Sequence, residues 1–230
     1  MTVSDFLSGI KILEEVESPI NGKIQVVRSL GLGTYIQVEG LTQSGGVVNE
    51  VWKTTLRKLK NKRTKELKNC LILGLGGGSA AKLVRKFWTD AKITGVEIDP
   101  IMVNLGKKYL KLDAVGVDVM IDDAENFLST ISHQPLRARD PQGSAILVIS
   151  YDLILVDLYI GRDVPEKFES ENYIHLVRSL LERSGIAIFN RLYYAEKRKE
   201  AEKFGEKLEK TFSKVERIFP EANVMFVCES

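Results

Sequence analysis

Two patterns of hydrophobic and polar residues divide the chain near residue 48. Before it, short β-rich runs separated by glycines predict a hairpin with strands at residues 23–28 and 34–38. After it, short apolar runs alternate with longer segments of helical periodicity. We therefore expect a small N-terminal β-hairpin domain at residues 1–48 and a larger domain at residues 49–230.

The larger domain is predicted to alternate strands with helices. The predicted strands are residues 70–75, 92–98, 115–121, 151–158, 186–192, 214–219 and 224–229. The predicted helices are residues 49–60 with Asn49 as cap, 80–88, 101–110 with Asp99 as cap, a short helix from 124, 173–181 and 195–212. This order indicates an α/β fold: a mostly parallel seven-stranded sheet with helices on both faces and one antiparallel strand. Residues 131–150 form an irregular insertion, in which residues 145–150 could be an extra strand.

The segment LILGLGGGSAAKLV, at residues 71–84, predicts a nucleotide-binding turn between a strand and a helix. Its glycines are Gly74, Gly76, Gly77 and Gly78. Glycines let a ligand approach the backbone, and the start of a helix offers N–H groups that have no intrahelical partner. Ser79 interrupts the G-x-G-x-x-G pattern of dinucleotide-binding folds, which disfavours NAD.

Acidic residues follow the next three predicted strands. Glu97 could accept hydrogen bonds from both ribose hydroxyls, and Asp122 with Asp123 suits an adenine amino group. Asp157 follows the fourth strand, beside the place where a reacting group would lie. Because ligands of open parallel sheets bind at the carboxyl ends of the strands, this ordered set predicts an adenosine-type ligand. The alternative is that the glycines make a tight turn and the acids cap helices.

With these motifs in order, the chain resembles the spermidine synthase family of polyamine aminopropyltransferases. The resemblance rests on LILGLGGGSAAKLVRKF, GVEIDPIMVNLGKKYL, VMIDDAENFL, YDLILVD and the segment from VPEKF to GIAIFN, with ESPINGKIQVV and TYIQVEGLTQ before them. It implies a class I methyltransferase-like, Rossmann-like fold and a sulfonium nucleoside, S-adenosylmethionine or its decarboxylated form, as the cofactor.

The resemblance also assigns roles to single residues. It implies that Glu97 holds the ribose, that Asp123 holds the adenine and that Gln43 reaches the nucleoside from the hairpin. Asp157 matches the acid that receives the attacking amine's proton or orients that amine. The neighbours Ile98 and Ala124 complete the predicted binding site, and no metal is expected.

Three positions depart from the family pattern, and all three affect amine binding. Ser79 replaces the acid that pairs with the ammonium of decarboxylated S-adenosylmethionine, Ile160 replaces a second acid after the fourth strand, and Val48 replaces a tyrosine. A helix N-terminus favours a carboxylate over an ammonium, so Ser79 favours ordinary S-adenosylmethionine. Asp122 or Glu50 could compensate for the missing acids.

Three functions therefore stay open. Global resemblance favours aminopropyl transfer to a diamine, and the three departures favour methyl transfer. The missing acceptor residues also fit a catalytically silent relative that binds a nucleoside or a partner protein. The predicted acceptor is a small amine or other nucleophile, and the resemblance suggests a homodimer.

Composition adds few constraints. Hydrophobic residues make up 44% and charged residues 28% of the chain, and the formal net charge of +2 predicts no particular partner. The basic stretch at residues 53–68 lacks interleaved aromatic residues, so it predicts a solvated helix face and argues against nucleic-acid binding. Nothing resembles a signal peptide or a membrane span, and Cys70 and Cys228 fit reduced thiols in a cytoplasmic protein.

Overall fold

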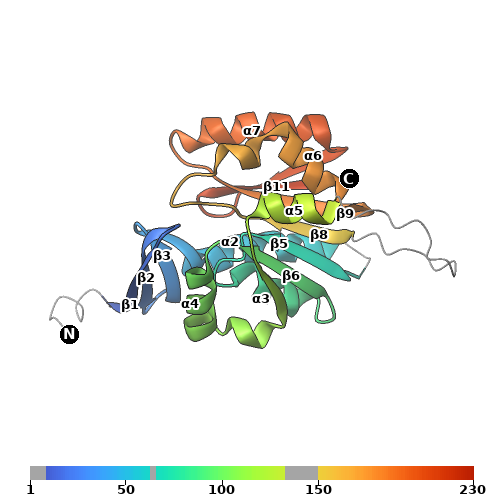
Figure 1. The fold of residues 1–230 in the computed structure, drawn as a ribbon. Coiled ribbons are helices and arrows are strands. Elements are labelled where there is room, and N and C mark those ends of the chain that lie inside the picture. The colour runs from blue at the N-terminus through green and yellow to red at the C-terminus, as the bar shows by residue number, and fades with distance from the viewer. Residues whose placement is uncertain (1–8, 63–65, 133–149) are drawn as a thin grey trace.

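The computed structural model describes residues 9–62, 66–132 and 150–230. Its N-terminal part is a four-stranded antiparallel sheet in the order β1-β2-β3-β4 (Figure 1). The strands are β1 (Ile10–Ser18), β2 (Gly22–Ser29), β3 (Gly33–Val38) and β4 (Leu41–Gly45). The predicted hairpin is the β2–β3 pair. The prediction missed β1, whose alternation is obscured by three glutamates, and β4, which is short and polar.

The main sheet has seven strands in the order β10-β11-β9-β8-β5-β6-β7. Its strands are β5 (Asn69–Leu73), β6 (Lys92–Glu97), β7 (Val117–Ile121), β8 (Tyr151–Val156), β9 (Leu181–Leu192), β10 (Lys214–Ile218) and β11 (Asn223–Glu229). Among these strands, β11 alone runs in the opposite direction to the other six. The predicted mostly parallel α/β sheet is therefore confirmed.

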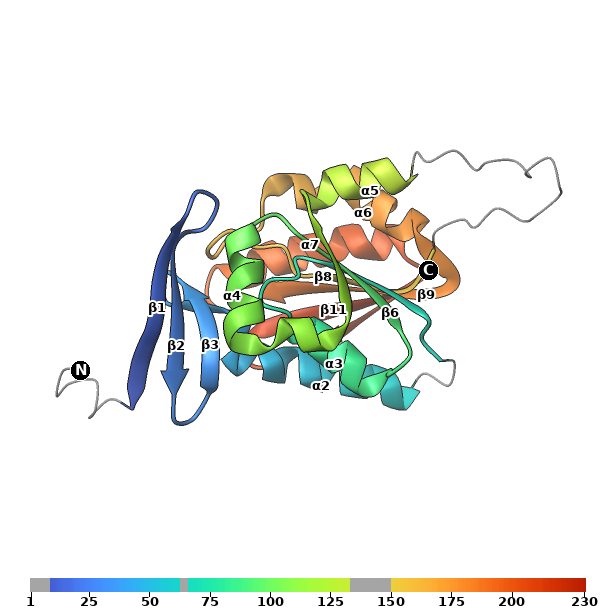
Figure 2. The ribbon, with the colours of Figure 1, turned by 60° about the horizontal axis from the view of Figure 1, so that its bottom comes forward.

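Helices cover both faces of this sheet, as the two ribbon views show (Figures 1 and 2). One face carries α2 (Gly46–Lys62), α3 (Ser79–Phe87) and α4 (Pro100–Leu110), followed by the short helix η1 (Leu112–Val115). The other carries α5 (Ala124–Ser132), the short helix η2 (Glu166–Glu169), α6 (Glu171–Ser179) and α7 (Lys197–Thr211). Each face buries its own apolar cluster, because the strand side chains alternate between the two faces.

Two predicted boundaries are wrong. The first helix begins at Gly46, so the predicted cap Asn49 lies inside α2. Gly45 and Gly46 have φ values of 78° and 44°, which turn the chain from β4 directly into the helix. Strand β9 begins at Leu181, earlier than the predicted residue 186. Most of the insertion, including nearly all of the possible strand at residues 145–150, lies outside the described residues.

The basic face of α2 is partly neutralised by acids. Lys58 and Lys62 both form ion pairs with Glu216 of β10, and Lys53 pairs with Glu50 one turn earlier. These exposed pairs leave less free positive charge than the sequence suggests. Among the described helices, none is long and apolar enough to cross a membrane.

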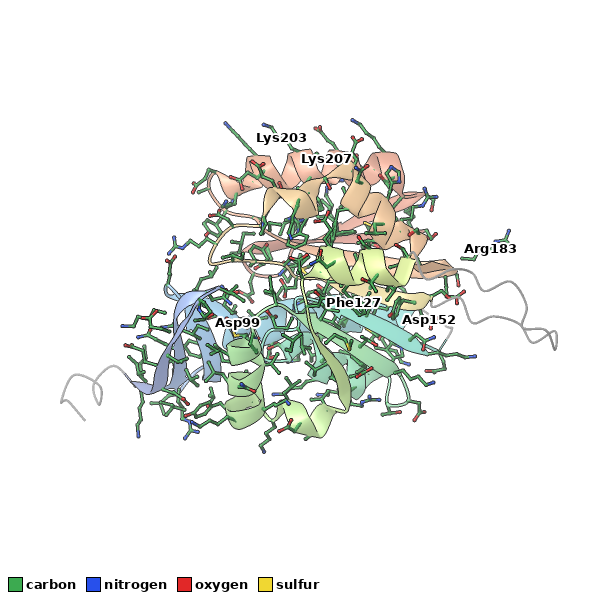
Figure 3. All side chains as sticks on the ribbon, in the orientation of Figure 1. Asp99, Phe127, Asp152, Arg183, Lys203 and Lys207 are labelled. Atoms are coloured by element: carbon green, nitrogen blue, oxygen red, sulfur yellow. The ribbon has the colours of Figure 1, made fainter. Side chains whose placement is uncertain are left out.

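The small sheet is joined to the main sheet through Asp99, the cap of α4. Its carboxylate accepts hydrogen bonds from Ser18 Oγ (2.6 Å), Asn21 Nδ2 (2.7 Å) and the backbone N–H of Ile101 (2.9 Å). Asp99 is completely buried. Figure 3 shows it at the end of the main sheet that faces the small sheet, while Asp152 lies at the opposite end. An apolar cluster of β2, β3 and α4 residues completes this contact.

Candidate nucleoside-binding site

A cavity of about 500 Å³ lies at the carboxyl ends of the parallel strands. The turns after β5, β6, β7 and β8 supply one set of walls, and β4 with the start of α2 supplies another. Open parallel sheets bind ligands at this edge, beside the point where the strand order reverses. Here that point lies between β5 and β8, which are hydrogen-bonded neighbours although they are far apart in the sequence.

The glycine turn after β5 is shaped as much by protein contacts as by the cavity. A Cβ atom on Gly74 would lie 2.1 Å from the backbone oxygen of Asp157, and one on Gly77 would lie 2.9 Å from side-chain atoms of Ile36 and Leu110. Gly78 has a φ of 89° and packs on Leu112. Gly74 and Gly76 line the cavity, whereas Gly77 and Gly78 do not. Gly77 and Gly78, which were predicted to contact the cofactor, therefore do not face the cavity directly.

Two serines join this turn to strand β4. The backbone N–H of Gly77 donates to Ser44 Oγ, and the backbone N–H of Gly45 donates to Ser79 Oγ, both at 2.7 Å. Ser79 is buried and lines the cavity. It is the first residue of α3, and the first turn of this helix contains no acid. The N–H groups of that turn have no acceptor within the helix itself.

Glu97 closes the far side of the turn. Its carboxylate accepts hydrogen bonds from the backbone N–H groups of Gly76 (2.7 Å) and Asp99 (3.0 Å). Burial raises the pKa of Glu97, and these two hydrogen bonds oppose that shift by favouring the ionised form. Glu97 is thereby fixed at the cavity wall as an acceptor, which is what a ribose diol requires.

The turn after β7 contains the predicted adenine-binding acids. Asp122, Asp123 and Ala124 all line the cavity. Asp123 forms an ion pair of 2.6 Å with Lys167 of η2, and Lys167 also lines the cavity. Ile98 lies on the same wall with 40% of its surface exposed, so it offers an apolar surface on which a base could stack.

Asp157, the predicted catalytic residue, is held at both carboxylate oxygens. Trp52 Nε1 donates to Oδ2 and Asn190 Nδ2 donates to Oδ1, each at 2.8 Å. The side-chain oxygen of Asn190 in turn accepts a hydrogen bond from Asn223 Nδ2 at 2.9 Å. Burial raises the pKa of Asp157, while the two donors lower it. Each carboxylate oxygen can accept a second hydrogen bond, so the group can still receive a proton.

Gln43 lies on β4 and lines the cavity, as the predicted contact from the small sheet requires. Its Nε2 donates to the backbone oxygen of Gly161 at 3.0 Å, so β4 also touches the loop after β8. The predicted set is brought together apart from Gly77 and Gly78. The cavity-lining members are Gln43, Gly74, Gly76, Ser79, Glu97, Ile98, Asp122, Asp123, Ala124 and Asp157.

Sequence reasoning did not assign Trp52, Asn190 or Lys167 to the site. Trp52 is one of the apolar residues along one face of a helix, and nothing in the sequence indicates that its N–H would contact the site. Asn190 lies two residues before the end of a predicted strand, and a polar residue after an apolar run near a carboxyl edge is a signal that could have found it. Within the described residues there is no cluster of three metal-binding side chains, and both cysteines are buried and unbridged.

Comparison with known proteins identifies a family that this chain matches. The model of the spermine/spermidine synthase domain matches residues 50–227. A probable polyamine aminopropyl transferase of Bifidobacterium longum is 28% identical over 122 residues, which are 53% of this chain and 24% of that protein. The chain spans less than half the length of the first curated relatives that it matches.

Two solved structures show the same fold. A probable spermidine synthase from Corynebacterium glutamicum superimposes with a TM-score of 0.72 at 16% identity, covering 95% of this chain and 80% of that one. Human methyltransferase-like protein 13 in complex with SAH gives a TM-score of 0.62 at 20% identity, covering 78% and 81%. The class I methyltransferase-like fold predicted from the sequence is thus confirmed.

Proposed function

Because the chain belongs to the spermine/spermidine synthase domain family, we propose that it is a transferase acting on a sulfonium nucleoside. The nucleoside occupies the cavity with its ribose on Glu97, its adenine near Ile98 and Asp123, and its sulfur toward Asp157. Structural relatives that include a methyltransferase in complex with SAH support a ligand of this class.

The proposed reaction is an in-line displacement. A lone pair on the acceptor nitrogen attacks the carbon bonded to the sulfonium sulfur, the carbon–sulfur bond breaks, and its electron pair stays on sulfur as a thioether. The nitrogen then loses a proton, which Asp157 accepts as a carboxylate. Trp52 and Asn190 hold that carboxylate in one orientation, so the protein contributes positioning and proton transfer.

We further propose that ordinary S-adenosylmethionine is the donor and that the transferred group is methyl. The observation that carries this proposal is the start of α3. There the Ser79 hydroxyl accepts a hydrogen bond from the backbone N–H of Gly45, and the first turn of the helix contains no acidic residue. Helix N-termini stabilise anions, and the methionine carboxylate is an anion. Decarboxylated S-adenosylmethionine has only an ammonium there, which this helix end disfavours.

Calorimetric titration with both nucleosides tests the choice of donor. We expect S-adenosylmethionine to bind more tightly to the native protein, and Ser79→Asp to shift the ratio of affinities toward the decarboxylated form. Ser79→Asn has nearly the same size without the charge, so it controls for the lost serine contact. Preference of the native protein for the decarboxylated form would contradict methyl transfer and favour aminopropyl transfer.

Product analysis then separates the three functions. Methyl transfer yields S-adenosylhomocysteine, and aminopropyl transfer yields methylthioadenosine. A catalytically silent relative binds the nucleoside and yields neither. Aminopropyl transfer is kept as the second candidate, since the spermidine synthase superposition covers 95% of this chain.

A further inference from the structure

The cavity has a second half beyond the nucleoside-binding walls. The ends of β5, β6 and β7 carry the residues assigned to the nucleoside. The ends of β8 and β9, the start of β11 and the first turns of α2 form the other walls. Asp157 lies at the end of β8, where the two halves meet. An acceptor that attacks the nucleoside near Asp157 has to occupy this second half.

The walls of this second half are mainly apolar. Their hydrophobic members include Val47, Val48, Trp52, Leu158, Ile160 and Leu192. Val47 and Val48 come from the start of α2, and Ile160 is 45% exposed in the loop after β8. These side chains offer an apolar slot next to one carboxylate.

Several polar groups of the second half are hydrogen-bonded to other protein groups. Asn223 donates to Asn190, and Asn190 donates to Asp157. The Tyr159 hydroxyl accepts a hydrogen bond from the backbone N–H of Leu192 at 2.9 Å. They form a connected network whose only acid is Asp157, which leaves no separate carboxylate for a second cation.

The other acidic side chains that line the cavity are hydrogen-bonded, ion-paired or exposed to water. Glu97 accepts two backbone N–H groups, and Asp123 is paired with Lys167. Asp122 accepts the backbone N–H of Asp123. Glu221 lies at the rim in an exposed turn, where water screens its charge. Among the described residues, no further acid lines this cavity.

We infer that the acceptor is a hydrophobic monoamine: a molecule with one nucleophilic nitrogen next to Asp157 and an apolar body along α2, β8 and β9. A second ammonium on the acceptor would lose its water without gaining a buried carboxylate, which is unfavourable. An alkyl body would instead replace water against Val48, Trp52 and Ile160, which is favourable. This inference rests on the proposed transferase function, because it places the nitrogen beside the nucleoside.

The test compares pentylamine with 1,4-diaminobutane. Pentylamine has a terminal methyl group where 1,4-diaminobutane has a second ammonium, and the two molecules are otherwise the same. Each is titrated calorimetrically into the full-length protein saturated with S-adenosylhomocysteine. We expect pentylamine to bind at least about tenfold more tightly, because burial of an unpaired charge is costly. Equal or tighter binding of the diamine, or no binding of pentylamine, would overturn the inference.

A pair of variants sharpens the test. Ile160→Asp adds a carboxylate to the apolar wall and is expected to raise the affinity for the diamine several-fold. Ile160→Asn has the same shape without the charge and is expected to leave the diamine weak. Thermal melting of both variants shows whether they fold. A diamine affinity that rises equally in both variants would mean that charge on this wall does not select the acceptor.

Failure of the proposed function gives a different result from failure of this inference. If titration with S-adenosylhomocysteine alone and with methylthioadenosine alone shows no binding of either, the transferase proposal fails. The two amines are then titrated into the free protein, where preference for pentylamine still supports an apolar amine pocket and preference for the diamine contradicts it.

Discussion

Glu97 is the residue on which nucleoside binding depends most directly in the proposed site. Its two carboxylate oxygens are fixed by the backbone N–H groups of Gly76 and Asp99, so the ribose would meet an acceptor that is already oriented. The variant Glu97→Gln keeps the size of the side chain but replaces one acceptor oxygen by a donor group.

We expect Glu97→Gln to weaken the binding of S-adenosylmethionine by about tenfold or more. A hydrogen bond to a charged group contributes about 1.5–3 kcal/mol, and the variant loses the charge. Calorimetric titration measures the affinity, and a melting curve checks that the turn is still folded. Unchanged affinity in a folded variant would remove Glu97 from the site.

The pKa of Asp157 depends on Trp52. Burial raises this pKa above the ordinary value of 3.8, and the indole N–H opposes the rise because it stabilises the carboxylate. Trp52→Phe removes this donor, so the pKa of Asp157 should rise further. Because the ionised form is the base, the acidic limb of the pH–rate profile should move to higher pH.

NMR titration of the Asp157 carboxyl carbon measures this shift without relying on turnover. Trp88→Phe is the matched control, since Trp88 is equally buried but its N–H has no partner in the described structure. The control should leave the pKa of Asp157 unchanged. If the two variants gave the same titration curve, Trp52 would have no specific role in holding Asp157.

At the scale of elements, the glycine turn is pressed between β4 and α4. A Cβ atom on Gly106 of α4 would lie 2.6 Å from the Cα atom of Gly77, which is far inside van der Waals contact. The turn cannot move away freely, because Ser44 of β4 holds Gly77 from the other side. The close approach of helix and turn thus requires glycine on both.

Overpacking by Gly106→Ala costs about 1–3 kcal/mol, and on balance we expect the variant to be destabilised by up to about 2 kcal/mol. Alanine gains about 1 kcal/mol over glycine in a helix interior, so the measured value is the difference between these two effects. Urea denaturation measures the free energy of unfolding. Gly31→Ala is the control, because a Cβ atom there has no neighbour within 4 Å. A stabilised Gly106→Ala variant would contradict the described packing.

The strands and helices that were predicted well have strong periodic patterns. The buried strands β5 and β8 contain continuous apolar runs at residues 70–73 and 153–156, and Asp99 with Pro100 gives a clear helix start. The strands that were missed owe their conformation to tertiary contacts. β4 has the sequence LTQSG, and its position depends on bonds to Ser79 and Gly77 that no local pattern contains.

At the scale of the whole molecule, most residues that line the proposed nucleoside half of the cavity were predictable, and those of the other half were not. Acids at strand ends are visible in the sequence, because parallel strands bring their carboxyl ends to one edge. Trp52 reaches Asp157 across 105 positions of the chain, and Lys167 reaches Asp123 across 44. Such contacts depend on how helices pack over the sheet edge, which periodicity does not encode.

The two sheets form one structural unit around the cavity. The Asp99 carboxylate accepts hydrogen bonds from Ser18 and Asn21 at the β1–β2 turn, and the backbone N–H of Asp99 donates to Glu97. The small sheet thus contributes a wall of the cavity through β4 and is fixed by Asp99, which is hydrogen-bonded to Glu97.

The serine contacts between β4 and the glycine turn have an evolutionary consequence. Ser44 holds Gly77, and Ser79 holds Gly45, so each partner constrains the other across the boundary between the sheets. Loss of either serine would leave a buried backbone N–H without its acceptor, which is costly, so a change in β4 affects the glycine turn and a change in the turn affects β4. A lineage that lost one of these serines should therefore show a compensating change in the strand or turn whose N–H the serine accepted.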